Sequence, residues 1–302
     1  MQTTHNVNNG RRRLFLMALP FILLVFLFNY LPLFGWIFAF FNYKPGIPLF
    51  KSPFVGFEYF KLIFSDGGIF NALRNTFIFG FLMIIGTVFP VVFAVFLSEI
   101  GSKFFKKLVQ TTTTLPYFLS WIIIYSITYA FFTTDGVFNN FFSAIGLIKT
   151  PSNILGNPDI VWWFQTALAL WKNVGWNAII YLAAITGIDA EQYDAASVDG
   201  AGRFEKILHV TLPGISSAYI VLLLLNISGM LSVGGLDQYL VFYNSLVADK
   251  IEVLDYYVYR IGLTTNDYSY ATAIGMFKSV ASIIMLFTVN WISKRVREDS
   301  II

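Results

Sequence analysis

The sequence contains no cysteine, which excludes disulfide bonds, thiolate metal sites and a cysteine nucleophile. Its two histidines, His5 and His209, stand far apart in the chain. Charged residues make up only 12% of the 302 residues, whereas about 25% is typical of soluble domains. A water-soluble fold of this length could not cover its surface with so few charges. The formal net charge of +3 is too small to indicate binding to nucleic acid.

Apolar residues, by contrast, make up 57% of the chain and are collected in long runs. A helix needs about 20 mostly apolar residues to cross a bilayer, because its backbone polar groups must all bond internally. Six stretches meet this requirement, and we expect membrane spans at about 14–41, 75–98, 109–132, 160–186, 214–236 and 270–293. The predicted fold is an all-α membrane protein with one transmembrane domain, 14–293, between tails at 1–13 and 294–302.

Basic residues indicate the orientation, because lysine and arginine are retained in short cytoplasmic loops. If both termini are cytoplasmic, the inner segments hold the denser basic clusters, which are Arg11, Arg12, Arg13, Lys103, Lys106, Lys107, Arg203, Lys206, Lys294, Arg295 and Arg297. The longer outer segments hold Lys44, Lys51, Lys61, Arg74, Lys149, Lys250 and Arg260. The first apolar run exceeds the about 7–15 residues of a signal-peptide core, so we expect it to be retained.

One inner segment has the pattern of two short helices separated by glycine. Asp189 can cap a helix that runs through Ala195, and Gly200 or Gly202 can end it. A second short helix is then expected at 203–210. Small alanines beside an acid give a surface that another protein can approach closely, with one charge left to pair with a basic group.

This segment resembles the EAA loop of ABC importer permeases, in which Glu-Ala-Ala is followed by three residues, glycine, nine residues and Ile-x-Leu-Pro. The matching positions are Asp194, Ala195, Ala196, Gly200, Val210, Leu212 and Pro213. Aspartate replaces the glutamate and valine the isoleucine. In that family the loop docks into a groove of the ATPase subunit. The resemblance therefore implies that loop 187–213 couples this chain to an ATPase through Asp194, Ala195, Ala196, Gly200, Leu212 and Pro213.

The resemblance extends over most of the chain and favours the carbohydrate permeases of the MalF and LplB type. The segments that carry it are Ala72–Thr76, Gln110–Thr111, Leu115–Pro116, Ser120–Trp121, Tyr256–Arg260 and Tyr268–Ala273. It implies the MetI-like permease fold, a multi-pass location in a bacterial cytoplasmic membrane and alternating access driven by ATP. The implied partners are a second, similar permease, two ATPase subunits, an extracytoplasmic solute-binding protein and an oligosaccharide.

The sequence lacks the phosphate loop G-x-x-x-x-G-K-[ST], so the ATPase must be another subunit and this chain is not expected to be an enzyme. No metal or cofactor motif is present, and none is expected. An ion-coupled secondary transporter is the alternative function, but such proteins usually show internal repeats, and no obvious repeat occurs here. A membrane enzyme would need a histidine or carboxylate constellation in the spans.

Two lysines, Lys172 and Lys278, are the formal charges deep in the expected spans. A charge at the bilayer centre costs at least about 2.5–3.5 kcal/mol, so both should face a protein interior or a water-filled path. Asn173, Trp176 and Asn177 stand beside Lys172, and such aromatic and amide groups suit carbohydrate. We therefore expect a substrate path formed by Lys172, Asn173, Trp176, Asn177 and Lys278.

Other interpretations of these residues remain open. Lys172 can snorkel or pair with a carboxylate such as Asp237. Asn226 can join helices to each other rather than contact substrate. Tyrosines in 237–267 can anchor spans or contact the binding protein, and a Phe57–Phe64 stripe can lie on the membrane or pack against the spans. The lysines favour an acidic sugar, whereas the family also carries neutral ones.

Overall fold

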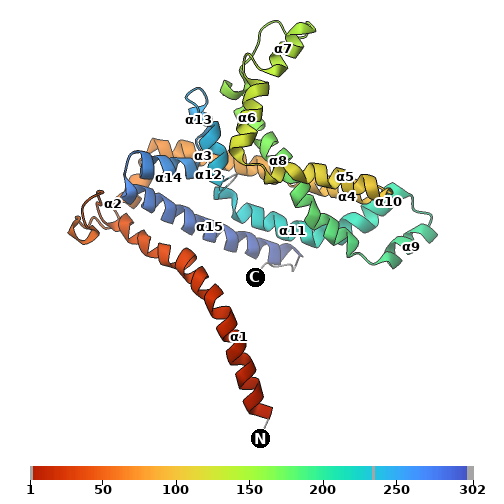
Figure 1. Cartoon of the computed structure of the whole chain (residues 1–302), viewed down its shortest axis with the longest axis horizontal. Helices are drawn as coiled ribbons and strands as arrows, with labels where there is room; N and C mark the ends of the chain where they lie inside the picture. The colour runs from red at the N-terminus through yellow and green to blue at the C-terminus, as the bar shows by residue number, and fades with distance from the viewer. Residues whose placement is uncertain (1–2, 233–234, 298–302) are drawn as a thin grey trace. The chain divides into compact units, whose positions relative to one another are not determined.

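The computed structural model describes residues 3–232 and 235–297, and nearly all regular structure in these ranges is helical (Figure 1). Within them the one bridge between extended segments joins Phe41 and Phe54. By length and composition, helices able to cross a membrane lie at Leu14–Phe40, Gly67–Ser98, Trp121–Ala144, Val161–Thr186, Arg203–Ser228 and Tyr268–Arg295. These six segments agree in number with the sequence prediction.

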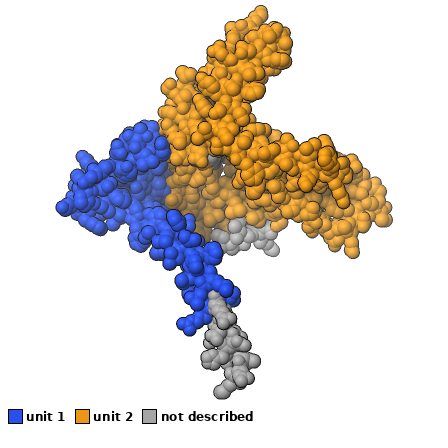
Figure 2. Space-filling view, viewed as in Figure 1, with its two compact units in different colours: residues 1–66, 258–277 blue, residues 67–257, 278–302 orange. Residues whose placement is uncertain are grey.

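The chain forms two compact units, residues 1–66 with 258–277 and residues 67–257 with 278–302 (Figure 2). In the first unit, α1 (Thr3–Val25) continues through a π-helical turn and a 3-10 stretch that begins at Leu31 and ends at Phe40. This unit also contains α2 (Glu58–Ile63), a π-helical turn at Arg260–Thr264 and the first part of α15 (Tyr268–Arg297).

The segment Tyr268–Ala273, which carries part of the family resemblance, forms hydrogen bonds with the loop between the first helix and α3. The Ser269 hydroxyl donates to the Phe41 carbonyl at 2.7 Å and accepts from the Tyr43 amide at 3.0 Å. The Tyr270 hydroxyl donates to the Asp66 carboxylate at 2.6 Å. These contacts link positions more than 200 residues apart. The first unit is therefore stabilised by polar side chains at the outer end of α15.

The aromatic stripe of α2 is divided between packing and exposure. Ile63 is 2% exposed, whereas Phe57 and Phe64 are 66% and 67% exposed. Phe40 packs against Phe57 and Phe60, at ring-centroid distances of 5.5 and 5.6 Å. Part of the stripe therefore packs within the unit, and a membrane-surface position for the exposed part stays a prediction.

The second unit holds the remaining helices. They are α3 (Gly67–Gly86), α4 (Val88–Ser98), α5 (Lys103–Thr114), α6 (Trp121–Phe132), α7 (Val137–Ala144), α8 (Val161–Thr186), α9 (Ala190–Val198), α10 (Arg203–Lys206), α11 (Leu212–Ser228), α12 (Gly235–Phe242), α13 (Ala248–Ile251), α14 (Leu254–Tyr259) and the end of α15. Helix α8 lies between two hydrophobic clusters. One includes Ala178, Tyr181 and Leu182 of α8 with residues of α4, and the other includes Val161 with residues of α3, α6 and α12.

A glycine allows α5 to lie directly against α8. A Cβ atom on Gly175 would collide with the backbone of Thr113 and Thr114. Because backbone atoms cannot move aside as side chains can, only glycine permits this approach. The proline at 116 then ends α5, since it cannot donate to the preceding turn.

Span three differs from its expected extent, 109–132. Helix α5 ends at Thr114, a 3-10 turn covers Leu115–Phe118, and α6 begins at Trp121 after Ser120, whose hydroxyl accepts from the Ile123 amide at 3.4 Å. The expected span therefore contains a helix break.

Span five also differs, because Pro213 does not interrupt it. The helix runs from Arg203 through a π-helical turn, Ile207–Thr211, into α11, which ends at Ser228. Pro213 lies in the first turn of α11, where a missing amide is tolerated. The expected end of this span at 236 includes residues 233–234, which lie outside the described residues.

The tyrosine-rich segment 237–267 contributes to the core of the second unit. Tyr239 and Tyr257 are 2% and 4% exposed, and Tyr243 stacks on Tyr256 with ring centroids 4.4 Å apart. Burial raises the pKa of the Tyr239 phenol, and the nearby Asp255 carboxylate raises it further. Tyr239 therefore stays neutral and acts as a packing residue.

Candidate functional site: a coupling loop, a broken helix and an outer clamp

Helix α9 forms the first half of the coupling loop. The Asp189 carboxylate caps it by accepting from the Glu191 amide at 3.0 Å. Asp194 and Ala195 are exposed, and Ala196 is partly exposed. The residues expected to contact an ATPase thus lie on a short, capped helix whose surface is accessible in this chain.

Gly200 ends α9 in the left-handed conformation, with φ of +81°. The Gly200 amide donates to the Ser197 carbonyl at 3.1 Å, and the Ala201 amide donates to the Ala196 carbonyl at 2.9 Å. This pattern is the glycine C-cap that satisfies the last carbonyls of a helix. A Cβ atom at position 200 would meet nothing within 4 Å, so glycine is needed here for its backbone angle rather than for space.

Side chains fix the second half of the loop against the first. The Glu205 carboxylate accepts from the Gly202 amide at 2.7 Å and starts α10. Lys206 donates to the Ser197 hydroxyl at 2.6 Å, across the turn. Arg203 lies 3.4 Å from the Glu99 carboxylate, at the end of α4. The loop therefore has one defined shape, and it is joined to two spans.

Two exposed apolar side chains flank the turn, and the sequence analysis missed them. Val198 is 88% exposed and Phe204 is 70% exposed. Isolated exposed apolar residues are common, but these two lie near Asp194 and Ala195 and are more exposed than Leu208 and Leu212 of the same loop, which are 42% and 36% exposed. The signal that could have revealed them is apolar residues at both sides of a glycine turn. Leu212 and Pro213, also expected in the site, are exposed in the first turn of α11.

Lys172 lies at the break between α5 and α6 and is 9% exposed. Its amino group donates to the carbonyls of Pro116 at 3.2 Å, Tyr117 at 2.7 Å and Leu119 at 2.6 Å. A lysine has three N–H groups, so these bonds use all of its donors. The alternative pairing with Asp237, which the structure also describes, is not formed. Lys172 instead donates to carbonyls at the helix break, of which the Pro116 carbonyl also accepts from the Leu119 amide at 3.1 Å.

Trp176 of α8 contacts this break, whereas the asparagines of α8 line a separate cavity. Trp176 stacks on Tyr117, with ring centroids 4.4 Å apart and planes 3° from parallel. Asn173 and Asn177 line a cavity of about 110 Å³ together with Asn226 of α11. The structure thus brings three amides to one cavity, although the sequence analysis treated Asn226 as a residue that joins helices.

The remaining residue expected in the path, Lys278, forms an ion pair with Asp255 of α14. The Lys278 side chain is 17% exposed and the Asp255 side chain 22%. A buried ion pair cancels the charge that each group would otherwise present. Lys278 is therefore neutralised within this chain.

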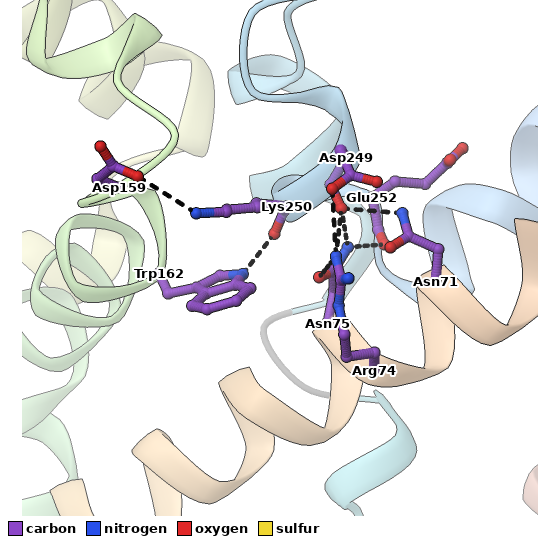
Figure 3. Close-up of polar contacts among 8 residues, drawn as sticks. All are labelled: Asn71, Arg74, Asn75, Asp159, Trp162, Asp249, Lys250 and Glu252. Atoms are coloured by element: carbon purple, nitrogen blue, oxygen red, sulfur yellow. Dashed lines mark hydrogen bonds and ion pairs between the residues drawn. The ribbon is translucent and has the colours of Figure 1, made fainter.

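An outer clamp joins α3 to the loop that contains α13 (Figure 3). The Asn75 amide donates to the carbonyls of Asp249 at 2.8 Å and Glu252 at 3.0 Å. Asn71 and Arg74 also donate to the Asp249 carbonyl, at 2.8 and 3.0 Å. Asn75 is fully buried. The family-like segment Ala72–Thr76 therefore acts by holding the backbone of a distant loop.

The other side of the outer clamp comes from α8. The Trp162 indole donates to the Lys250 carbonyl at 2.7 Å, and the Lys250 amino group lies 3.5 Å from the Asp159 carboxylate (Figure 3). We define the outer clamp as Asn71, Arg74, Asn75, Asp159, Trp162, Asp249, Lys250 and Glu252. It fastens the outer ends of spans two and four to one loop.

Asn75→Ala is expected to lower the free energy of unfolding by about 2–3 kcal/mol, because the fully buried Asn75 amide donates hydrogen bonds to two carbonyls, those of Asp249 and Glu252. Thermal unfolding of the purified protein measures this. Asn71→Ala is the matched control, since the Asp249 carbonyl keeps its bonds from Arg74 and Asn75. Equal Tm losses in the two variants would contradict a special role for Asn75.

Comparison with known proteins gives the family. Residues 86–298 match the model of the family described as binding-protein-dependent transport system inner membrane component. The chain is 39% identical to Protein LplB of Bacillus subtilis over 95% of this chain and 90% of that protein. It is 36% identical to the polygalacturonan/rhamnogalacturonan transport system permease YteP of the same organism, over 96% and 90%.

Solved structures agree with this result. A bacterial ABC transporter involved in the import of the acidic polysaccharide alginate matches with a TM-score of 0.87 and 31% identity, over 98% of this chain and 100% of that chain. The alginate transporter solved with a pentasaccharide-bound periplasmic protein matches with a TM-score of 0.86. The predicted resemblance, the six-span all-α fold and the multi-pass membrane location are confirmed. The chain belongs to the binding-protein-dependent transport system inner membrane components and is the permease, not the ATPase, of an ABC importer.

Proposed function

We propose that this permease moves oligosaccharides across the cytoplasmic membrane. The observation that carries the proposal is the match of nearly the whole chain to permeases whose names specify carbohydrates. These include the YteP system for polygalacturonan and rhamnogalacturonan and the alginate transporter. More distant relatives carry arabinooligosaccharides and trehalose or maltose, at 26% and 28% identity. The class of substrate is thus common to relatives that differ in sugar.

The chain works beside a second, similar permease, with two ATPase subunits inside and a solute-binding protein outside. The coupling loop docks on an ATPase subunit through α9. Its exposed small residues allow close approach, Asp194 pairs with a basic group, and Val198 and Phe204 add apolar contact. When the ATPase subunits close on ATP, they move this loop and the two permeases open to the other side.

The transport path runs past the break in span three. Trp176 offers an aromatic face, and the amides of Asn173, Asn177 and Asn226 offer donors and acceptors for sugar hydroxyls. Lys172 and Lys278 belong to the walls of this path as supporting residues, because their amino groups are already occupied. The path therefore recognises sugar mainly through neutral groups.

Import by the whole complex in proteoliposomes tests the proposal. The permease pair, the ATPase and the binding protein are reconstituted together, and uptake of a labelled oligosaccharide mixture is measured with ATP. Uptake should require both ATP and the binding protein. Uptake that proceeds without them and follows a proton or sodium gradient would instead support a secondary transporter.

Asn177→Ala is expected to reduce sugar uptake roughly tenfold while the complex still assembles, because an exposed amide is removed from the path and no structural contact depends on it. Uptake rate and recovery of the complex are measured together. Asn140→Ala, in the outer helix α7, is the control. If Asn177→Ala lowers complex recovery as much as uptake, the residue is a packing residue.

Asp194→Lys is expected to reduce co-purification of the ATPase at least about fivefold, because it places a positive charge where pairing with a basic group is proposed. The amount of ATPase retained on the tagged permease measures this. Asp199→Lys, on the same loop just before the glycine turn, is the matched control. Full retention by Asp194→Lys would remove this residue from the docking surface.

A further inference from the structure

A second cavity lies at the break in span three, on the side of Ser120. It has a volume of about 560 Å³ and is lined by Tyr117, Ser120, Trp121, Lys172 and Asp237, with apolar residues completing the wall. Ligand cavities in proteins typically measure about 300–1,000 Å³. Aromatic rings, a hydroxyl and a carboxylate thus line a space large enough for a sugar unit.

The cavity lies beside the middle of span four, because Lys172 is near the middle of α8 (Val161–Thr186). Asp237 is exposed there. In the part of the chain that the structure describes, no lysine or arginine lies within ion-pair distance of its carboxylate. A carboxylate beside a membrane span is costly unless it faces water or a polar ligand. The cavity therefore forms part of a water-filled route.

The charges around this route determine which sugars fit it. Lys172 donates all three of its N–H groups to carbonyls, and Lys278 is paired with Asp255. Lys278 is therefore paired with a carboxylate, and Lys172, which lines the cavity, has no N–H group left to donate to an acidic sugar, although its neutral carbonyl partners do not cancel its charge. The Asp237 carboxylate is exposed and lines the cavity, and a carboxylate accepts hydrogen bonds from neighbouring sugar hydroxyls. A second carboxylate beside it would be repelled.

We propose that the cavity beside Asp237 is a sugar-unit site and that Asp237 makes it selective for uncharged sugar units over uronates. This inference rests on the proposed function, since it takes the substrate to be an oligosaccharide. It reverses the expectation from sequence, in which the two lysines favoured an acidic sugar. Asp237 is thus a specificity-determining residue for import.

The absence of cysteine from the natural chain makes a direct test possible. Ile122, which lines the same cavity and is 66% exposed, is replaced by cysteine in the whole complex. The reaction rates of the introduced thiol are measured with a cationic reagent, trimethylammonium-ethyl methanethiosulfonate, and an anionic one, sulfonatoethyl methanethiosulfonate. Asp237→Asn should lower the cation-to-anion ratio of these rates at least about fivefold, by loss of one nearby charge. Ser120→Cys gives a second reporter in the same cavity.

Asp135→Asn, a carboxylate of an outer loop, is the control and should leave the ratio measured with Ile122→Cys unchanged. Sugar selectivity is tested by protection of the thiol at position 122 with digalacturonate and with its uncharged dimethyl ester. The ester should protect better, and the difference should disappear in Asp237→Asn. Lack of labelling at both positions, an unchanged ratio, or equal or absent protection by the two sugars would each overturn the inference.

These outcomes are distinguishable from failure of the proposed function. Labelling and protection report on the cavity and require no ATP. If the ratio and the protection behave as expected but the complex imports no sugar in proteoliposomes, the site stands and the import function fails. If the complex imports sugar but the cation-to-anion ratio is unchanged in Asp237→Asn, the import function stands and the proposed site fails.

Discussion

Lys172→Met should lower the free energy of unfolding by about 3 kcal/mol, because the part-buried carbonyls of Tyr117 and Leu119 lose their donor and the Pro116 carbonyl keeps only the Leu119 amide. At roughly 2–4 °C per kcal/mol, Tm should then fall by about 6–12 °C. The carbonyls of Tyr117 and Leu119 lie at the break between α5 and α6, where the Lys172 amino group is their donor. Thermal unfolding in detergent, followed by the fraction of monodisperse protein, measures the effect.

Trp171→Ala is the matched control, since Trp171 is adjacent in α8 and is 46% exposed. Its Tm should remain close to that of the natural protein. Lys172→Arg should restore part of the loss, because a guanidinium keeps the charge and several donors. If Lys172→Met keeps the natural Tm and loses only sugar uptake, then Lys172 contacts substrate and its structural assignment is wrong.

Gly200→Val should reduce ATPase retention and sugar-stimulated ATP hydrolysis at least about tenfold. A residue with a Cβ atom pays about 1–2 kcal/mol in the left-handed region, and a β-branched residue is a stronger outlier. Relief of this strain requires a different turn, which separates α9 from α10 and removes the bond between Lys206 and Ser197. Co-purification of the ATPase and its hydrolysis rate measure the result.

Gly202→Ala provides the control, because Gly202 has φ of −71° and its nearest prospective neighbour is the Glu205 carboxylate at 3.8 Å. This variant should retain the ATPase. Equal losses in both glycine variants would mean that bulk at the docking surface, rather than the backbone angle, limits the contact.

The sequence predicted the local structure of the start of loop 187–213, a capped helix ended by glycine, because its signals are local. Asp189 caps a helix two residues away, and Gly200 ends it through its own backbone angle. Both effects act over a few residues and depend little on the rest of the fold. Coupling itself remains a prediction, since it depends on a partner chain.

The partners of Lys172 could not be predicted in the same way. The rule that a membrane charge must be compensated indicates a need but names no partner. The carbonyls that meet it lie 53–56 residues away and become available only because Pro116 breaks the helix. A carboxylate such as Asp237 was the simpler candidate from sequence alone.

The outer clamp illustrates the same limit over a longer distance. Arg74 and Asn75 carry the family resemblance, yet their role depends on a loop 174–177 residues further along the chain. Every residue has a backbone carbonyl. The sequence around residues 249–252 therefore does not reveal that a distant side chain binds the backbone there. The resemblance marked these positions without giving their contacts.

The helix of span five is continuous from Arg203 to Ser228, so a rotation at one end displaces the other end. Its 26 residues extend about 39 Å at 1.5 Å per residue. One end is in the coupling loop, and Asn226 lies near the other end, in the wall of the asparagine cavity. A tilt of about 10° imposed at the ATPase would displace that far end by about 7 Å over this length. If the loop docks on the ATPase as proposed, a small angular movement inside the cell is converted into a displacement wider than a water molecule at the proposed sugar path.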